Sequence, residues 1–281
     1  MTEIAPTTGV SHGDPVATVA LRSAYFRRVG LLVAAVPALV VFPGLFVVAG
    51  LVPSVVAALV AAFASASWWR STTSGGDATL LSSFSTQPAD PVRHARLVNL
   101  TDGLSLVSGV VRPELLVCAG DAPCALVVAS GDGSSVIVVT EGAVTSWDRM
   151  ESEAVLAHLL FRVRSGDAAL VTTVLAWSSA AAKLGLGKLA KSVRARVVDG
   201  AFVLASDVAA CRATRYPPAM VSALEKAQAF PGDPAQSDLP ASLAPLWFAV
   251  PGNDTTQRSG FPSVEAFHPP LADRIALCKE I

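Results

Sequence analysis

Charged residues are scarce in this chain. Only 15% of its 281 residues are Asp, Glu, Lys or Arg, and the formal net charge is −1. Recognition of nucleic acid requires a concentrated basic surface, so this composition argues against a nucleic-acid partner. The hydrophobic share is 52%, which indicates a membrane component in a chain long enough for a sizeable core.

Cysteine is also rare, and the spacing of the four cysteines fits no metal site. Cys118 and Cys124 flank a predicted hairpin turn, where they would pair in an oxidising compartment. Cys211 and Cys278 stand alone on predicted helices. We therefore expect buried, reduced thiols.

Charge is absent altogether between residues 29 and 69. One membrane-spanning helix needs about 20 apolar residues, so a run of this length predicts a hairpin of two helices, near 29–49 and 53–69. The run is too long for the apolar part of a secretory signal. Arginines precede the first helix and follow the second, with none in the loop between. The positive-inside rule then predicts a multi-pass integral membrane protein whose N-terminus and C-terminal domain are cytoplasmic.

The hairpin divides the chain into four parts: a flexible tail (1–28), the transmembrane hairpin (29–70), a polar linker (71–87) and a folded domain (88–281). The folded domain is predicted to be α+β and mainly α. Apolar periodicity predicts helices at 90–110, 202–214, 217–228 and from about Leu271, with a long loop at 229–262. Short runs rich in Val, Leu and Ile, separated by turns, predict a small antiparallel sheet at 115–119, 125–130 and 135–140.

Two later segments bear on membrane contact. Residues 168–182 are apolar but only about 15 long, which favours a buried or membrane-surface helix over a third crossing. Five basic residues follow on an amphipathic segment at 183–196. They form either a solvated helix face or a contact with anionic lipid headgroups.

The candidate site is the segment ESEAVLAHLLFRVRSGD, residues 151–167. A zinc-peptidase helix carries His, then Glu as general base, then a second His four residues after the first. Here the first position is His158, the base position is Leu159 and the second ligand position is Arg162. The frame of a zinc site is present, and most of its chemistry is absent.

Five segments, in order, resemble the HtpX-like family of membrane zinc endopeptidases, which includes the CAAX prenyl proteases. They are LVNLTDGLSLVSGVVRPELLV, SSVIVVTEGAV, the segment with His158 and Asp167, ASDVAACRATRYPPAMVSALEKA and HPPLADRIAL. The resemblance covers roughly residues 88–281 and implies a zincin-like (gluzincin) fold. It places the family's third zinc ligand, a Glu, at Val203, four residues before Asp207, and its C-terminal His at His268. It also places the family's substrate-lining edge strand at 123–126.

The resemblance implies that zinc, the family cofactor, has lost two of its three ligands and its general base here, with only His158 retained. We expect His158 to be a buried neutral imidazole bonded to Asp207 or a carbonyl, and Arg162 to pair with Asp207 or another acid. A rebuilt metal site of His158, Asp207 and His268 is the competing interpretation, with Arg162 repelling the ion.

Three functions remain open. The first is a catalytically inactive, membrane-anchored peptidase homologue that binds, scaffolds or regulates other integral membrane proteins. The second is an active membrane metalloendopeptidase with a rebuilt metal site, acting in membrane-protein quality control. The third is a purely structural accessory subunit of a membrane assembly.

Overall fold

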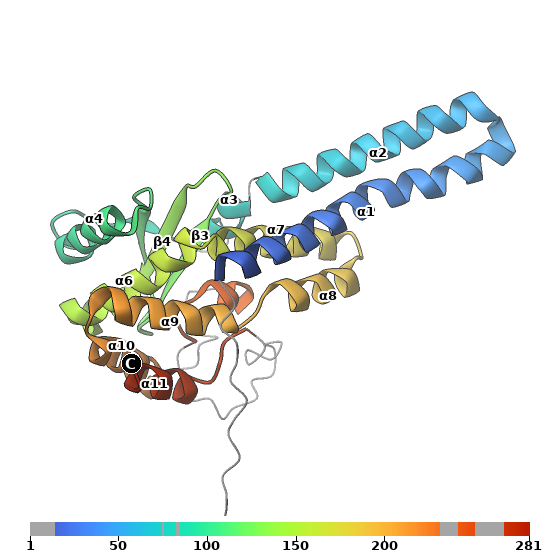
Figure 1. The fold of residues 1–281 in the computed structure, drawn as a ribbon. Coiled ribbons are helices and arrows are strands. Elements are labelled where there is room, and N and C mark those ends of the chain that lie inside the picture. Colours follow the sequence, from blue (N-terminus) through green and yellow to red (C-terminus); the bar gives the residue numbers. More distant parts are fainter. Residues whose placement is uncertain (1–14, 75, 83–84, 231–240, 251–266) are drawn as a thin grey trace, which may run out of the picture.

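The structure is a computed structural model, and it describes residues 15–74, 76–82, 85–230, 241–250 and 267–281. Residues 1–14 of the predicted tail, and 231–240 and 251–262 of the predicted loop, lie outside the described residues. A long two-helix hairpin projects from a body of helices and one small sheet (Figure 1).

The two predicted apolar helices are present and antiparallel. Helix α1 runs Pro15–Ala49 and α2 runs Leu51–Ser74, joined at Gly50, whose positive φ of 83° suits glycine. By length and composition both helices could cross a membrane. Apolar side chains in their outer parts are exposed, such as Val47 at 86% and Phe63 at 78%, whereas a soluble protein keeps such side chains in its core.

Helix α1 begins much earlier than the sequence predicted. Residues 15–28, predicted as part of a flexible tail, are helical. The reason is tertiary packing, because Phe26 is buried with its ring centroid 4.8 Å from that of Trp69 and 5.7 Å from that of Trp177. Arg22 also pairs with Asp199. The composition of residues 15–28 gave no indication of these contacts of Phe26 and Arg22.

The segment predicted as a polar linker is also largely helical where it is described. Helix α2 continues to Ser74, and α3 occupies Gly76–Leu81. The hydroxyl groups at the end of α2 donate to carbonyls three or four residues earlier, as Thr73 Oγ1 does to Trp69 O at 2.8 Å. Such bonds satisfy the hydroxyl groups within the helix.

The sheet has four strands and is mixed, so the predicted all-antiparallel sheet is incorrect. Its order is β1-β2-β4-β3, and β2 pairs with β4 in parallel. The antiparallel β3–β4 hairpin inserts β4 between β3 and β2, which makes β2 and β4 run in the same direction. The strands are β1 (Gln87–Pro88), β2 (Glu114–Cys118), β3 (Ala125–Ala129) and β4 (Ser135–Thr140).

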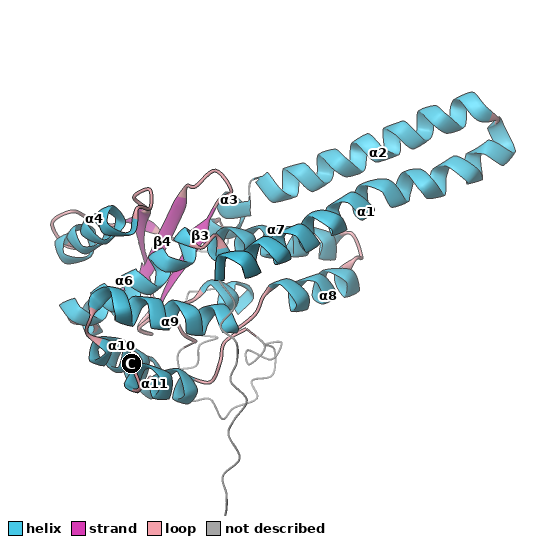
Figure 2. Ribbon diagram, in the orientation of Figure 1, coloured by secondary structure: helices cyan, strands magenta, loops and turns pink. Residues whose placement is uncertain are grey.

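Helices cover both faces of this sheet (Figure 2). Val127 and Ile137 of β3 and β4 pack into one core with α6, α9, α10 and α11. Leu126 and Val138 face a second core with α7, α8 and the foot of α1. Both faces of β3 and β4 are therefore buried under helices. The helices of the body are α4 (Ala95–Ser108), α5 (Glu141–Ser146), α6 (Arg149–Arg164), α7 (Asp167–Lys183), α8 (Gly187–Val197), α9 (Ala201–Thr214), α10 (Pro217–Ala229) and α11 (Leu271–Lys279).

Two further predictions were tested by these bounds. Helix α4 starts five residues after its predicted start, because the Asp90 carboxylate accepts from the backbone of Val92 and Arg93 and holds a turn there. Helix α7, for which we expected a buried or surface helix, is a core helix, with Val174 and Trp177 fully buried.

Candidate functional site

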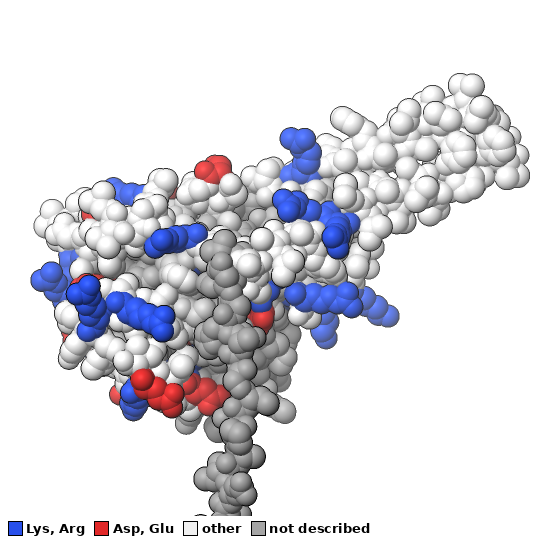
Figure 3. All heavy atoms as spheres, in the orientation of Figure 1, with Lys and Arg blue, Asp and Glu red and all other residues white. Residues whose placement is uncertain are grey.

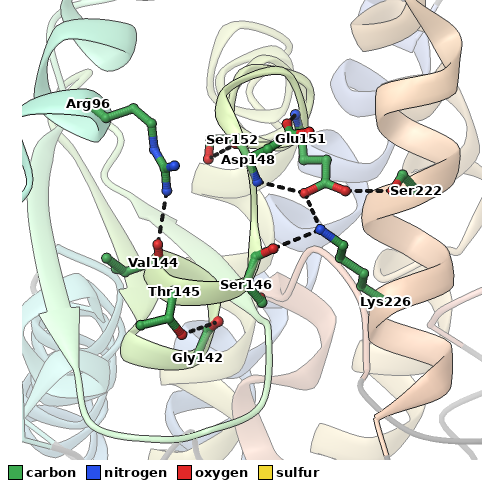
Figure 4. A network of polar contacts seen from close by, with 10 residues as sticks. All are labelled: Arg96, Gly142, Val144, Thr145, Ser146, Asp148, Glu151, Ser152, Ser222 and Lys226. Atoms are coloured by element: carbon green, nitrogen blue, oxygen red, sulfur yellow. Dashed lines mark hydrogen bonds and ion pairs between the residues drawn. The ribbon is translucent and has the colours of Figure 1, made fainter.

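The helix that carries the candidate site, α6, is fixed at its start by a capping box. Asp148 accepts from the Glu151 backbone at 2.8 Å, and Glu151 accepts in return from the Asp148 backbone at 2.7 Å. The buried Glu151 carboxylate also accepts from Ser222 Oγ (2.5 Å) and Lys226 Nζ (2.6 Å) of α10 (Figure 4). Lys226 further donates to Ser146 O at 2.7 Å. The Glu151 carboxylate therefore connects α6 to α10 through hydrogen bonds.

His158 lies in the middle of α6 and is fully buried. Its Nδ1 is 2.9 Å from Oδ1 of Asp207 on α9, although the approach lies outside the direction of a good hydrogen bond, and neither ring nitrogen has a well-formed hydrogen bond among the described residues. Burial lowers the pKa of His158 below its usual value, against the opposing effect of Asp207. Burial therefore favours the neutral ring, whereas the expected hydrogen bond to Asp207 or a carbonyl is not formed among the described residues.

The charge of Asp207 is neutralised by Arg274 of α11. Arg274 donates from Nε to Oδ2 at 2.7 Å and from Nη2 to Oδ1 at 2.8 Å, and its Nη1 donates to Phe248 O at 2.8 Å. Burial alone would raise the pKa of Asp207, but the Arg274 guanidinium and the His158 contact bring the pKa down to about 2. Asp207 is therefore an anion that is already fully paired.

Arg162, at the second ligand position, pairs with a different acid. Its Nε donates to Asp167 Oδ2 at 2.8 Å, its Nη2 lies 2.7 Å from the same oxygen, and Nη2 also donates to Pro245 O at 2.9 Å. Both side chains are buried. Of the two alternatives that the sequence left open, the structure selects Asp167, the first residue of α7.

Apolar side chains occupy the remaining site positions. Leu159, where a general base would stand, is fully buried, and Val203, where a third ligand would stand, is 2% exposed. The ring of Phe248 lies edge-on to His158, with centroids 5.2 Å apart and planes at 88°. The centre of the site is packed as an apolar core around paired charges.

His268 does not join His158 and Asp207. Its Nε2 lies 2.6 Å from Ala244 O, a distance at which the ring donates to the carbonyl. Burial lowers the pKa of His268 to about 3, with the nearby Arg274 acting in the same direction. The residues described here do not fit zinc, because no group of three His, Cys, Asp or Glu among them is arranged to hold a metal.

The edge of the sheet next to the site is covered by the chain itself. Strand β3 is an edge strand, and Trp247 forms an antiparallel bridge with Leu126. Phe248 N then donates to Ala125 O at 2.7 Å, and Cys124 Sγ donates to Ala249 O at 3.2 Å. An extended peptide that paired with this part of β3 would have to displace residues 247–249.

Sequence reasoning missed two of the residues that shape this site. Arg274 was noted only as part of the C-terminal segment, because its partner, Asp207, lies 67 residues away on α9 and no local pattern joins the two. Phe248 lay in a segment predicted as loop, where an adjacent Trp and Phe were the only signal of a buried turn. All four cysteines are buried, as expected, and no disulfide joins them.

The chain is similar over most of its length to curated bacterial proteins named Protease HtpX homolog. The relative from Acidiphilium cryptum (strain JF-5) is 27% identical, over 89% of this chain and 94% of its own length. The relative from Tropheryma whipplei (strain TW08/27) is 26% identical, over 66% of this chain and 72% of its own. That from Dictyoglomus thermophilum is also 26% identical, over 64% and 67%. No protein-family model matches the chain, and no solved structure matches significantly.

Proposed function

These relatives support an HtpX-like family for the chain, and on that premise we propose that it is a membrane-anchored, catalytically inactive homologue that binds or scaffolds other integral membrane proteins. The single observation that carries the loss of catalysis is the burial of Leu159 and Val203, apolar side chains at the family's base and third-ligand positions. The Asp207 carboxylate beside His158 is already paired with Arg274. A zincin-like ancestry of the body belongs to the same proposal.

The substitutions support one another physically. Leu159 and Val203, from α6 and α9, are both buried, so both helices contribute apolar volume where the family places a base and a ligand. A catalytic zinc site uses three protein ligands and a water. Restoring either of these two positions would still leave an apolar side chain at the other and Arg162 at the second ligand position, which argues for loss of the whole site.

The membrane anchor is the α1–α2 hairpin, with both ends of the hairpin and the body on the cytoplasmic side. Arg27, Arg28 and Arg70 stand at its foot, and none of the described residues at its outer turn is charged. In this proposal the hairpin holds the body at the bilayer, and exposed surfaces of the body contact the partner.

A peptidase assay tests the loss of catalysis. Purified full-length protein in proteoliposomes is given excess zinc and an unfolded substrate such as casein. We expect no cleavage above that of empty liposomes. Zinc-dependent cleavage that a His158→Gln variant abolishes would instead support the rebuilt metallopeptidase, which the names of the relatives favour.

Photo-crosslinking from native membranes tests the scaffold role. A photoreactive residue at Leu106, exposed on α4, probes the body, and one at Phe63 probes the hairpin. Crosslinks from Leu106 to another membrane protein support the proposal. Crosslinks from Phe63 alone would indicate a purely structural accessory subunit, and none from either position would contradict both functions.

A further inference from the structure

The connection between α7 and α8 exposes apolar and basic side chains together. We call residues 183–191 the α7–α8 corner. Leu184 is 60% exposed and Leu189 is 41% exposed, with Leu186 between them. The lysines of the corner are all exposed, and none pairs with a described acid: Lys183, Lys188 and Lys191.

Packing holds this corner beside the foot of the hairpin. Helix α8 buries Ala190, Val193 and Val197 and packs against α7 and α1. On the α1 side, Arg196 lies over the ring of Tyr25, 5.8 Å from its centroid. The exposed side of α8 is therefore fixed relative to the hairpin axis.

The foot of the hairpin continues the basic surface. Arg27 and Arg28 of α1 and Arg70 of α2 are exposed. Figure 3 shows Lys and Arg gathered at this foot and over α8, while the outer hairpin carries no charge. Residues 29–49 of α1 provide about 30 Å of helix at about 1.5 Å per residue. This equals the thickness of a hydrocarbon core, about 30 Å, so the arginines would lie at headgroup level.

We propose that the α7–α8 corner docks on the same bilayer as the hairpin, with its leucines in the interface and its lysines on anionic phospholipid headgroups. Exposed leucines flanked by lysines are the composition of an interfacial segment. Lysines alone would suit a solvated face. Three neighbouring exposed leucines instead form an apolar patch, which is typical of an interaction surface. The inference rests on the proposed insertion of the hairpin, and it is independent of the state of the peptidase site.

Hydrogen–deuterium exchange of the full-length protein in nanodiscs tests the docking. Amides 184–189 are followed in zwitterionic phosphatidylcholine and in mixtures containing phosphatidylglycerol. We expect slower exchange in the anionic discs. Each basic residue near an anionic surface contributes about fivefold in affinity. A Lys188→Gln/Lys191→Gln variant should therefore bind the anionic surface about 25-fold more weakly and lose most of the slowing of exchange. High salt should have the same effect.

An Arg149→Gln/Arg212→Gln variant is the matched control, since it removes two exposed cations from α6 and α9. It should keep the slowing. Exchange of the buried helix α6 checks the fold of each variant. A Ser192→Glu variant, which adds an acid to the exposed side of α8, provides a second test of the same loss.

Three results would overturn the inference. The first is equal exchange of the corner in both lipids, and the second is slowing that survives the lysine variant. The third is equal slowing by soluble glycerol phosphate, which would show binding of a free anion and not a surface. Exchange of residues 31–48 separates the two proposals: fast exchange there would refute the membrane hairpin itself.

Discussion

Arg274 and Asp207 form two parallel hydrogen bonds, of 2.7 and 2.8 Å, with both side chains fully buried. The pair joins α11 to α9 and directs the same carboxylate toward His158. A buried pair of this kind contributes little net stability as a unit, but removing one partner leaves an uncompensated charge.

We predict that Arg274→Met lowers the free energy of unfolding by about 3–5 kcal/mol. The measurement is chemical unfolding of the detergent-solubilised protein. Lys279→Met is the control. Lys279 is also on α11 and pairs with Glu225 of α10, but this pair is exposed, so its loss should cost at most about 1 kcal/mol. An Arg274→Met variant as stable as the control would show that Asp207 is not charged.

Stability should fall as the pH is lowered from about 6.5. The folded-state pKa values of His158 and His268 are lowered, the latter to about 3, so the unfolded chain takes up protons that the folded chain does not. Each histidine then costs about 1.4 kcal/mol per pH unit between its unfolded pKa and its folded pKa. Asp207, with a folded pKa of about 2, adds a further loss as the pH falls from 3.8 toward 2.

The test of this dependence is a series of unfolding measurements at several pH values. A His268→Gln variant, which can still donate to Ala244 O, should show a slope smaller by one proton between pH 6 and 4. An unchanged slope would mean that His268 is not the buried neutral group described above.

Phe248→Ala should destabilise the protein by about 3–5 kcal/mol, the usual cost of truncating a buried Phe. It should also accelerate hydrogen exchange in β3, because residues 247–249 cover that edge. Val92→Ala, at an exposed position, is the control and should change neither quantity. Unchanged β3 exchange in Phe248→Ala would show that the covering segment is held by other contacts.

Lys226→Met should weaken the hydrogen-bonded connection between α6 and α10. The Lys226–Glu151 bond is charge-assisted and Glu151 is buried, so we expect a loss of about 1.5–3 kcal/mol. Ser222→Ala removes the second donor to the same carboxylate. The double variant should deviate from additivity, since both side chains share one acceptor.

The sequence predicted the helices and strands better than it predicted their packing and strand pairing. Apolar runs located both hairpin helices, three of the four strands of the described sheet and most helices of the body, because each of these runs is visible locally in the sequence. The early start of α1 at Pro15 and the parallel pairing of β2 with β4 depend on contacts between distant segments, such as that of Phe26 with Trp69, which no local pattern records.

The candidate site shows the same limit. The positions of His158, Leu159 and Arg162 were readable because zinc helices have a fixed spacing. The resemblance also predicted Asp207 as one of two possible partners of His158. It left the partner of Arg162 open, and the role of Arg274 emerged only when α11 was seen against α9.

The most direct test of the central claim is the zinc content of the full-length protein, purified from native membranes without chelator and measured by mass spectrometry. The account predicts well under one zinc per chain, with no difference between the wild type and a His158→Gln variant. One zinc per chain in the wild type that is lost in His158→Gln would contradict it.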